Sequence, residues 1–172
     1  MFCWRITKYN PQYRNSKGHY VKDEWTAISD IGTEYENKKF TFEQYITVEN
    51  TYIAAIELFM DCTKTSTMCV THLEKYALSK NAILDTKAME DVFNKVISHL
   101  LVHKNEIEMI SRLVLREVFW CVLKAENMRI HFGYDYYMYI ESTKACKQAI
   151  QKIEKLGLFV EPARPPEYES DE

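Results

Sequence analysis

The sequence predicts an α+β fold in which about four principal helices pack on a small, mostly antiparallel sheet. The chain has 172 residues, of which 47% are hydrophobic and 27% charged, and this is the composition of one globular domain. Neither glycine nor proline occurs between Gly32 and Gly133, which favours long helices there. Shorter segments near both ends alternate apolar and polar residues, as half-buried strands do. We expect a compact domain over residues 1–161 and an acidic, disordered tail over 162–172.

The N-terminal segment is expected to form a strand. Residues 2–9 alternate between apolar and other side chains with the period of two that strands have. Asparagine, proline and glycine in residues 10–18 then indicate a loop. Asp23 is expected to cap a short helical turn, which Gly32 ends in the left-handed conformation.

The first long helix is predicted over about residues 42–61. Thr41, followed three residues later by Gln44, is a capping-box signal directly before it. Apolar residues then recur at intervals of three or four. The β-branched residues of segment 68–73 predict a strand after this helix, with a loop as the alternative.

Two further helices are expected in the middle of the chain. Asp85 or Thr86 is a candidate cap for one of them, and its apolar face continues to Leu101. The other is expected over about residues 106–124, where the apolar stripe is wide.

The last third of the chain is predicted to contain strands around one more helix. Segments 128–132 and 135–140 indicate two strands joined by a tight bend. Ser142 is the expected cap of the helix, and Gly157 follows its last turn as a stop signal. Residues 158–160 form a short final strand.

The cysteine count and the absence of targeting signals predict a cytoplasmic protein. The five cysteines are Cys3, Cys62, Cys69, Cys121 and Cys146. Their odd number and the lack of a C-x-x-C pair argue against a disulfide framework and against a cysteine-only zinc site, and favour a reducing compartment. The sequence has no signal-peptide pattern and no apolar run near the roughly 20 residues that span a bilayer. We expect no membrane partner.

Most of the net charge of −3 lies at the C-terminal end. Residues 161–172 contain five acidic side chains and one arginine, so the rest of the chain is almost neutral. A broad basic surface for nucleic acid is therefore not expected. Any electrostatic attraction to a partner must come from a local patch.

Motifs of catalysis and cofactor binding are weak. His99, His103 and Glu106 would share one face of an uninterrupted helix at metal-ligand spacing, but a solvated turn is the favoured interpretation. Cys121 and His131 could form a nucleophile and base, but a buried cysteine on an apolar helix is favoured. No phosphate-binding glycine motif is present. We predict no catalytic residue, no metal and no cofactor.

The densest aromatic feature lies around Asp135, in the segment GYDYYMY (133–139). In a strand, alternation would place Tyr137 and Tyr139 on one face and Tyr136 with Met138 on the other. Tyrosine combines apolar area with a polar tip, so such a strand can be a contact surface. The alternative is a strand packed on helices with its hydroxyls hydrogen-bonded.

Several strings resemble those of small stand-alone bacterial proteins, some of which are similar to immunity proteins of contact-dependent growth inhibition and related polymorphic toxin systems. These strings are WRITKY (4–9) with Asn10, Pro11 and Arg14, EWT (24–26) with SDIG (29–32), GYDYYMY (133–139), and GLFVE (157–161). The resemblance implies a cytoplasmic protein, not an enzyme, that binds and blocks the C-terminal toxin domain of an effector. Such toxins are often nucleases, including transfer-RNA-cleaving ones in assemblies that could include elongation factor Tu.

Acids and aromatic residues complement a cationic nuclease cleft. We therefore predict toxin contacts at Asp30, Glu34, Glu36, Tyr134, Asp135 and Tyr139. One alternative is a small hydrolase that acts on RNA or a nucleotide through the region of Arg5, Arg14, Asp30 and His131. Another is an adaptor that binds a host protein through the tyrosine-rich strand.

Overall fold

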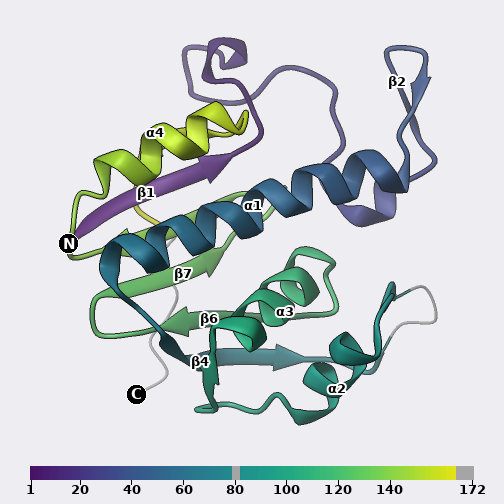
Figure 1. The fold of residues 1–172 in the computed structure, drawn as a ribbon. Coiled ribbons are helices and arrows are strands. Elements are labelled where there is room, and N and C mark those ends of the chain that lie inside the picture. Colours follow the sequence, from purple (N-terminus) through teal and green to yellow (C-terminus); the bar gives the residue numbers. More distant parts are fainter. Residues whose placement is uncertain (79–81, 166–172) are drawn as a thin grey trace.

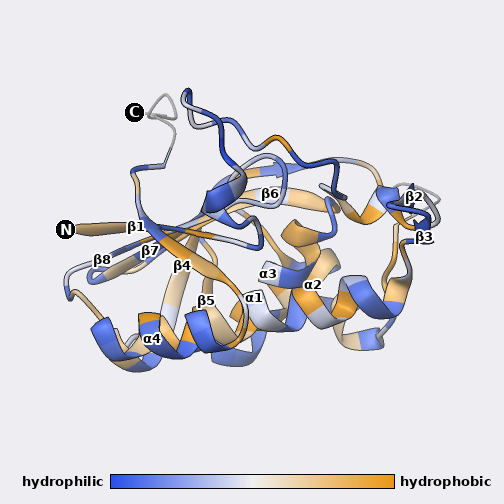
Figure 2. Ribbon diagram, turned by 90° about the horizontal axis from the view of Figure 1, so that it is seen from above, coloured by the Kyte–Doolittle hydropathy of each residue, from blue (hydrophilic) through white to orange (hydrophobic). Residues whose placement is uncertain are grey.

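The computed structural model describes residues 1–78 and 82–165, and within them four helices lie on one face of a seven-stranded sheet (Figure 1 and Figure 2). The strand order is β5-β4-β6-β7-β8-β1-β9, and every neighbouring pair is antiparallel. The strands are β1 (Phe2–Thr7), β4 (Thr67–Lys75), β5 (Leu101–His103), β6 (Phe119–Lys124), β7 (Met128–Phe132), β8 (Met138–Ser142) and β9 (Phe159–Pro162). The helices are α1 (Phe42–Thr63), α2 (Lys87–Lys95), α3 (Lys104–Leu115) and α4 (Lys147–Lys155). The predicted α+β fold is confirmed.

Helix α1 is the longest helix in the described part of the chain. Its predicted capping box is confirmed, because the Thr41 hydroxyl accepts from the Gln44 amide at 3.3 Å and the Gln44 side chain accepts from the Thr41 amide at 3.0 Å. Its buried aromatic residues, Tyr45, Tyr52 and Phe59, are completely shielded from solvent. Burial of each such side chain stabilises the fold by roughly 1.5–3 kcal/mol.

The second predicted helix is shorter than expected. Of the two candidate caps, Asp85 and Thr86, it is Thr86 that caps α2. The helix ends at Lys95, and the backbone of Val96 is extended. Leu101, predicted to lie on its apolar face, belongs instead to β5, which pairs with β4. The backbone groups of this segment bond to the sheet, because the His99 amide donates to the Val70 carbonyl at 2.7 Å. Pairing at the sheet edge replaces the helical hydrogen bonds.

The helix predicted over residues 106–124 is wrong in its second half. Helix α3 ends at Leu115, and the chain turns through Glu117, with a positive φ of 57°, into strand β6. Cys121 and Val122 are both buried, although neighbours in a strand face opposite sides. A strand buried on both faces has a continuous apolar run, so its sequence lacks the alternation that distinguishes a strand from a helix.

Two predicted caps differ from the structure. Ser142 ends β8, whereas α4 begins after Cys146, which has a left-handed backbone. Asp23 does not cap the turn before Gly32. Asp30 holds that turn instead, since its carboxylate accepts hydrogen bonds from the backbone amides of residues 26 and 27. Gly32 does adopt the predicted left-handed conformation, with φ 98°.

The strands predicted at both ends of the chain form the centre and one edge of the sheet. Strand β1 lies between β8 and β9, and β7 follows β8. Strand β9 extends to Pro162, one residue past the predicted end of the domain, and residues 166–172 of the predicted tail lie outside the described residues. Among the described helices, none is long and apolar enough to cross a bilayer.

A disulfide joins Cys62, in the last turn of α1, to Cys146 at the start of α4. Their Cα atoms are 5.8 Å apart, although 84 positions separate them in the sequence. The prediction that the cysteines stay reduced is therefore wrong for this pair. Spacing in the sequence could not reveal it, because only the fold brings the two helix ends together. The cytoplasmic prediction thus loses the support that the cysteine count gave it.

Candidate binding cleft

A cavity of about 280 Å³ opens where three segments meet: residues 26–27, the α3–β6 turn, and the β7–β8 turn. Its walls are mainly apolar and aromatic, and they include Leu115, Phe119, Trp120, Phe132 and Tyr136. Its rim carries two carboxylates and two exposed phenols, from Glu117, Asp135, Tyr76 and Tyr134. We call this cavity and its rim the acidic–aromatic cleft.

Residues 133–137 form a hydrogen-bonded turn between β7 and β8, and the strand predicted over residues 135–140 begins only at Met138. The Gly133 amide donates to the Tyr137 carbonyl at 2.8 Å, and the Tyr137 amide donates to the Tyr134 carbonyl at 3.1 Å. Asp135 and Tyr136 both have positive φ, at 54° and 63°. The turn leaves Tyr134 90% exposed.

Tyr136 anchors this turn in the core. Its ring makes edge contacts with Trp25, Tyr45 and Tyr52, with centroid distances of 5.0, 5.8 and 4.9 Å. The buried Tyr52 hydroxyl also donates to the Tyr136 carbonyl at 2.8 Å. A left-handed backbone is costly for a bulky residue, on the order of 1–3 kcal/mol, and persists only where packing holds it. The aromatic cluster therefore fixes the rim of the cleft.

Glu117 is the rim residue that the sequence analysis missed. Burial raises the pKa of its carboxyl, and the nearby Asp30 carboxylate raises it further. Asp30 lies behind the rim, because it holds residues 26 and 27 of the cleft wall. Two adjacent charged residues, Arg116 and Glu117, interrupt the apolar run of residues 113–123. This interruption is the feature of the sequence that could have indicated a turn.

The structure brings two predicted contact residues, Tyr134 and Asp135, to the cleft, and Asp30 lies directly behind its wall. Glu34 and Glu36 lie in a neighbouring hairpin, formed by β2 (Glu34–Tyr35) and β3 (Lys38–Lys39), and both are exposed. The hairpin adjoins Asp30 through the hydrogen bond from the Thr33 amide to the Asp30 carbonyl, at 2.9 Å.

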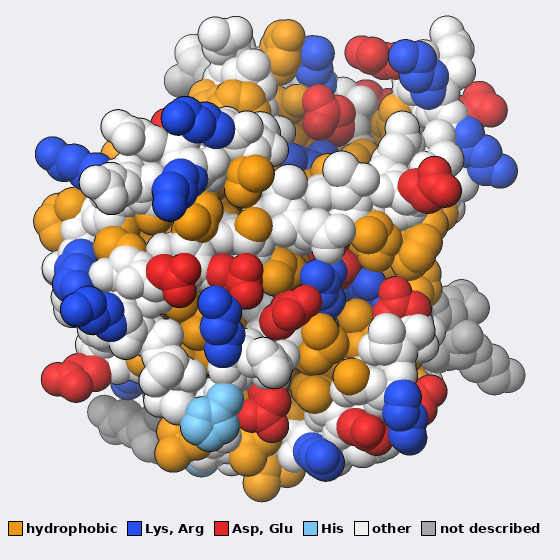
Figure 3. All heavy atoms as spheres, in the orientation of Figure 1, with side chains coloured by type: hydrophobic (Ala, Val, Ile, Leu, Met, Phe, Trp, Pro, Cys, Tyr) orange, Lys and Arg blue, Asp and Glu red, His pale blue; other side chains and the backbone are white. Residues whose placement is uncertain are grey.

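The charges of this hairpin nearly cancel. Glu34 lies opposite Lys39 in the strand pairing, and Lys38 follows the turn that carries Glu36. Figure 3 shows acidic and basic side chains intermixed at the upper right, where Figure 1 places this hairpin. The negative charge of the region therefore lies mainly at the cleft.

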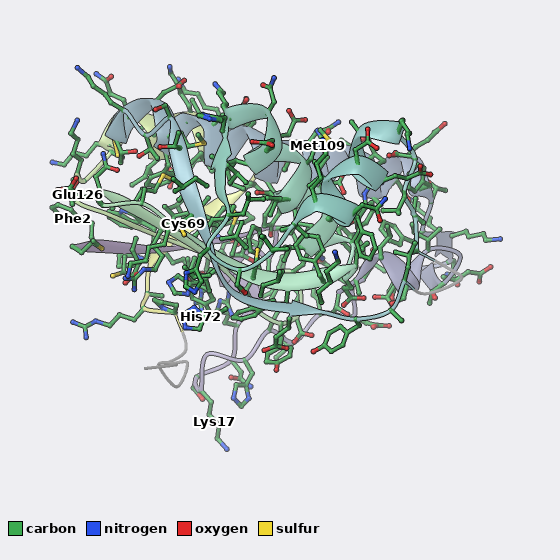
Figure 4. All side chains as sticks on the ribbon, turned by 90° about the horizontal axis from the view of Figure 1, so that it is seen from below. Phe2, Lys17, Cys69, His72, Met109 and Glu126 are labelled. Carbon is green, nitrogen blue, oxygen red and sulfur yellow. A yellow bond between two sulfur atoms is a disulfide. The ribbon has the colours of Figure 1, made fainter. Side chains whose placement is uncertain are left out.

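Tyr139 is placed apart from the cleft, on the sheet face that points away from the helices. It lies opposite Arg5 of β1 and His131 of β7 in the strand register. The predicted alternation holds here, since Tyr136 and Met138 are buried while Tyr137 and Tyr139 are half-buried. On the same side of the sheet lie His72 and Lys17 (Figure 4).

Three of the four residues of the hydrolase alternative contact carboxylates on the sheet face that carries Tyr139. Arg5 and Arg14 both contact Glu161, at 3.0 and 3.3 Å. His131 lies 3.2 Å from Glu141, and burial lowers the pKa of its imidazole. Asp30 instead holds the turn behind the cleft wall, so the four residues do not form one group.

Neither the candidate metal site nor the candidate nucleophile–base pair has the geometry that the sequence suggested. His99 is in a turn with φ 65°, His103 ends β5, and Glu106 lies in the first turn of α3, so the three do not share a helix. Among the described residues, no group of three or more potential ligands is placed to hold a metal ion. Cys121 is buried on a strand, not on a helix, and burial raises its pKa to about 12. His131 lies opposite Val122 in the strand pairing, so the two side chains share one face of the sheet. Cys121, the neighbour of Val122, points to the other face, away from His131.

Comparisons with protein-family models, curated proteins and solved structures found no match for the chain. The fold and the cleft define an α+β protein with an aromatic-walled, acidic-rimmed cavity. Its function must be argued from that cavity and its surroundings.

Proposed function

We propose that the protein is an immunity protein that binds a cognate toxin domain and neutralises it. The toxin is a nuclease, with a transfer-RNA-cleaving enzyme as the first choice, and the complex forms in the cytoplasm, where elongation factor Tu could join it. One observation carries the proposal: an exposed tyrosine and unpaired carboxylates surround an apolar cavity. Nucleases bind phosphate backbones with basic residues, so an acidic surface complements them.

The shape of the rim supports a role in protein binding. Tyr134 is almost fully exposed, yet its backbone is fixed by the turn that Tyr136 anchors. A side chain that is already held in place loses less entropy on binding, and tyrosine is common among residues that dominate binding energy. Tyr134 therefore has the properties of an interface anchor.

The cleft alone is too small for a stable complex. Standard protein interfaces bury roughly 800 Å² on each partner. The β2–β3 hairpin adjoins the turn that Asp30 holds, and it extends the same end of the molecule with Glu34 and Glu36. We infer that the toxin covers the cleft and the hairpin together.

The test is co-expression of the protein with the toxin domain encoded beside it. We expect growth to be restored and a complex to co-purify. Replacing Asp135 by lysine should weaken that complex more than tenfold, equivalent to about 1.4 kcal/mol. Glu126→Lys is the matched control, because Glu126 is exposed in the β6–β7 turn and does not line the cleft.

Three outcomes would count against the proposal or against the cleft as its interface. Growth rescue without any complex would show that neutralisation does not occur by binding. Equal affinity of the Asp135→Lys and Glu126→Lys variants, when both are folded, would remove the cleft from the interface. Hydrolysis of RNA or nucleotides by the purified protein alone would favour the hydrolase alternative.

A further inference from the structure

The two carboxylates on the cleft rim are not neutralised by an ion pair, unlike those that hold the fold together. Glu24, Glu49, Glu141 and Glu161 each form an ion pair with a lysine or an arginine. In contrast, no ion pair within the described residues involves Glu117, Asp135 or Asp30. The described residues that line the cleft also include no lysine, arginine or histidine. The rim carboxylates of Glu117 and Asp135 therefore carry negative charge that no described ion pair offsets, whereas Asp30, behind the rim, interacts electrostatically with Lys8.

The walls of the cleft suit an apolar stem below a charged group. Leu115, Phe119 and Phe132 provide apolar surface, while Tyr76 and Tyr134 bring exposed rings to the rim. A cation placed over a tyrosine ring is attracted by the negative face of the ring. Lysine and arginine side chains combine an apolar stem with a cationic end.

The cleft is at the small end of the range for ligand pockets and has room for one side chain. Its volume is about 280 Å³. Pockets that enclose small molecules and cofactors are typically about 300–1,000 Å³. A nucleotide or another phosphate ester would also be repelled by the carboxylates of Glu117 and Asp135.

We propose that the acidic–aromatic cleft is a receptor for one arginine side chain of a protein partner. The stem of the arginine lies against the apolar walls, and its guanidinium lies at the rim between Glu117, Asp135 and the ring of Tyr134. Arginine fits better than lysine, because its planar guanidinium donates to two carboxylates and stacks on aromatic rings. This inference deepens the proposed function and rests on it only for the identity of the partner.

The raised pKa of Glu117 is consistent with a site that binds a cation. Its pKa is raised by burial and by Asp30, so its charged form lacks stabilisation in the free protein. A guanidinium beside it would favour that charged form. Glu117 and Asp135 are also held in left-handed backbone conformations, with φ 57° and 54°, which fix where their side chains start.

The experiment uses two small probes that differ only in charge. N-acetyl-arginine amide is titrated into the full chain, and the neutral isostere N-acetyl-citrulline amide is the comparison. Binding is followed by amide chemical shifts in nuclear magnetic resonance spectra. We expect shifts centred on residues 117 and 133–137, with a dissociation constant on the order of millimolar, as suits one isolated side chain. Citrulline should bind at least tenfold more weakly.

A pair of conservative variants makes the test specific. Glu117→Gln keeps the shape of the rim and removes one charge, so it should weaken arginine binding at least tenfold. Glu126→Gln removes an exposed charge elsewhere and should leave arginine binding unchanged. Equal binding of both probes, or shifts that lie outside the cleft, would overturn the inference.

The outcomes separate this inference from the proposed function. Arginine binding in the cleft without any toxin complex would keep the receptor and reject the immunity role. A toxin complex of unchanged affinity in the Glu117→Gln variant, together with no arginine binding, would keep the immunity role and reject the receptor.

Discussion

The guanidinium of Arg116 donates two hydrogen bonds to the carboxylate of Glu49, from Nε at 2.7 Å and from Nη2 at 2.9 Å. Both side chains are almost completely withdrawn from solvent, and Arg112 adds a third hydrogen bond to Glu49 at 2.7 Å. Arg116 directly precedes Glu117. The pair therefore ties α1 to the turn that forms one rim of the cleft.

Replacing Glu49 by glutamine should destabilise the protein strongly. The change leaves the buried Arg116 guanidinium with only the partly exposed Asp85, at 3.1 Å, as a counter-ion. Removing one partner of a buried ion pair costs about 3–5 kcal/mol. Urea unfolding measures this as a loss of unfolding free energy. Glu43→Gln is the control, since Glu43 is exposed on the same helix and should change stability by less than about 0.5 kcal/mol. A similar small loss for Glu49→Gln would contradict the structural role of the pair.

Reduction of the Cys62–Cys146 disulfide should lower stability but leave toxin binding intact. A crosslink between residues 84 positions apart restricts the unfolded chain, and the chain-entropy relation gives a contribution of about 4.5 kcal/mol. Tyr45 packs on the cleft residue Tyr136, and Cys62 lies roughly 25 Å further along α1. Unfolding and binding are measured with and without dithiothreitol, with Cys69→Ser as the control for loss of a free cysteine. Weaker binding after reduction, while the protein stays folded, would refute this independence.

Lys8 should make stability increase between about pH 8 and pH 10. Its ammonium lies over the rings of Tyr9 and Trp25, at 3.9 and 4.2 Å, and burial lowers its pKa to about 8 although Glu24 opposes the shift. The folded chain releases this proton from about pH 8, whereas the unfolded chain keeps it until its ordinary pKa of 10.5. Because the unfolded chain binds more protons in this window, folding becomes more favourable as pH rises.

The Lys8→Met variant tests this pH dependence. Urea unfolding at about pH 7.5 and about pH 9.5 should show a more positive change in unfolding free energy for the natural chain than for the variant. The buried Cys121 thiol, whose pKa is raised to about 12, acts in the opposite direction in both proteins, so the difference between them reports Lys8. Measurements stay below about pH 10, where tyrosines of the unfolded chain ionise. The same pH response in both proteins would show that Lys8 is not its source.

Removing the Tyr52 hydroxyl should destabilise the fold and loosen the cleft rim. This hydroxyl accepts from the Lys8 amide at 2.9 Å and donates to the Tyr136 carbonyl at 2.8 Å. Tyr52→Phe leaves both backbone groups without this partner, at a cost of about 1–3 kcal/mol each. Thermal unfolding measures the loss, and hydrogen exchange at the β7–β8 turn should become faster. Tyr134→Phe, which changes an exposed phenol, should do neither.

Tyr134→Ala should weaken the toxin complex without changing the stability of the free protein. The side chain is 90% exposed, so its removal costs the fold little, whereas truncation of an interface anchor costs 2 kcal/mol or more, about a thirtyfold loss of affinity. Isothermal titration calorimetry measures the affinity. An unchanged affinity would place Tyr134 outside the interface.

Local signals in the sequence predicted the elements with distinctive ends or alternation. Thr41 and Gln44 marked the start of α1, and alternation marked β1 and β7. Strand β6 was missed because it is buried on both faces, and its apolar run has no period that excludes a helix. The turn before it contains no glycine, although Glu117 adopts a left-handed backbone.

The candidate site was predictable only in part for a related reason. Tyr134 and Asp135 stood out as a dense polar and aromatic string. Glu117 joins them through the packing of α3 and β6 against the β7–β8 turn, a relation between distant segments that no local pattern records. The Cys62–Cys146 disulfide was missed for the same reason.

The place of β1 in the sheet bears on when the protein becomes active during its synthesis. The first strand pairs with β8 and β9, so Ile6 meets Met138 across about 130 residues of chain. A ribosome that adds roughly 5–20 residues per second needs about ten seconds to supply that partner. The nascent chain cannot close its sheet or complete the cleft before then. If the protein has the proposed immunity role, a cell that makes it only after a toxin has entered would be unprotected for at least that interval.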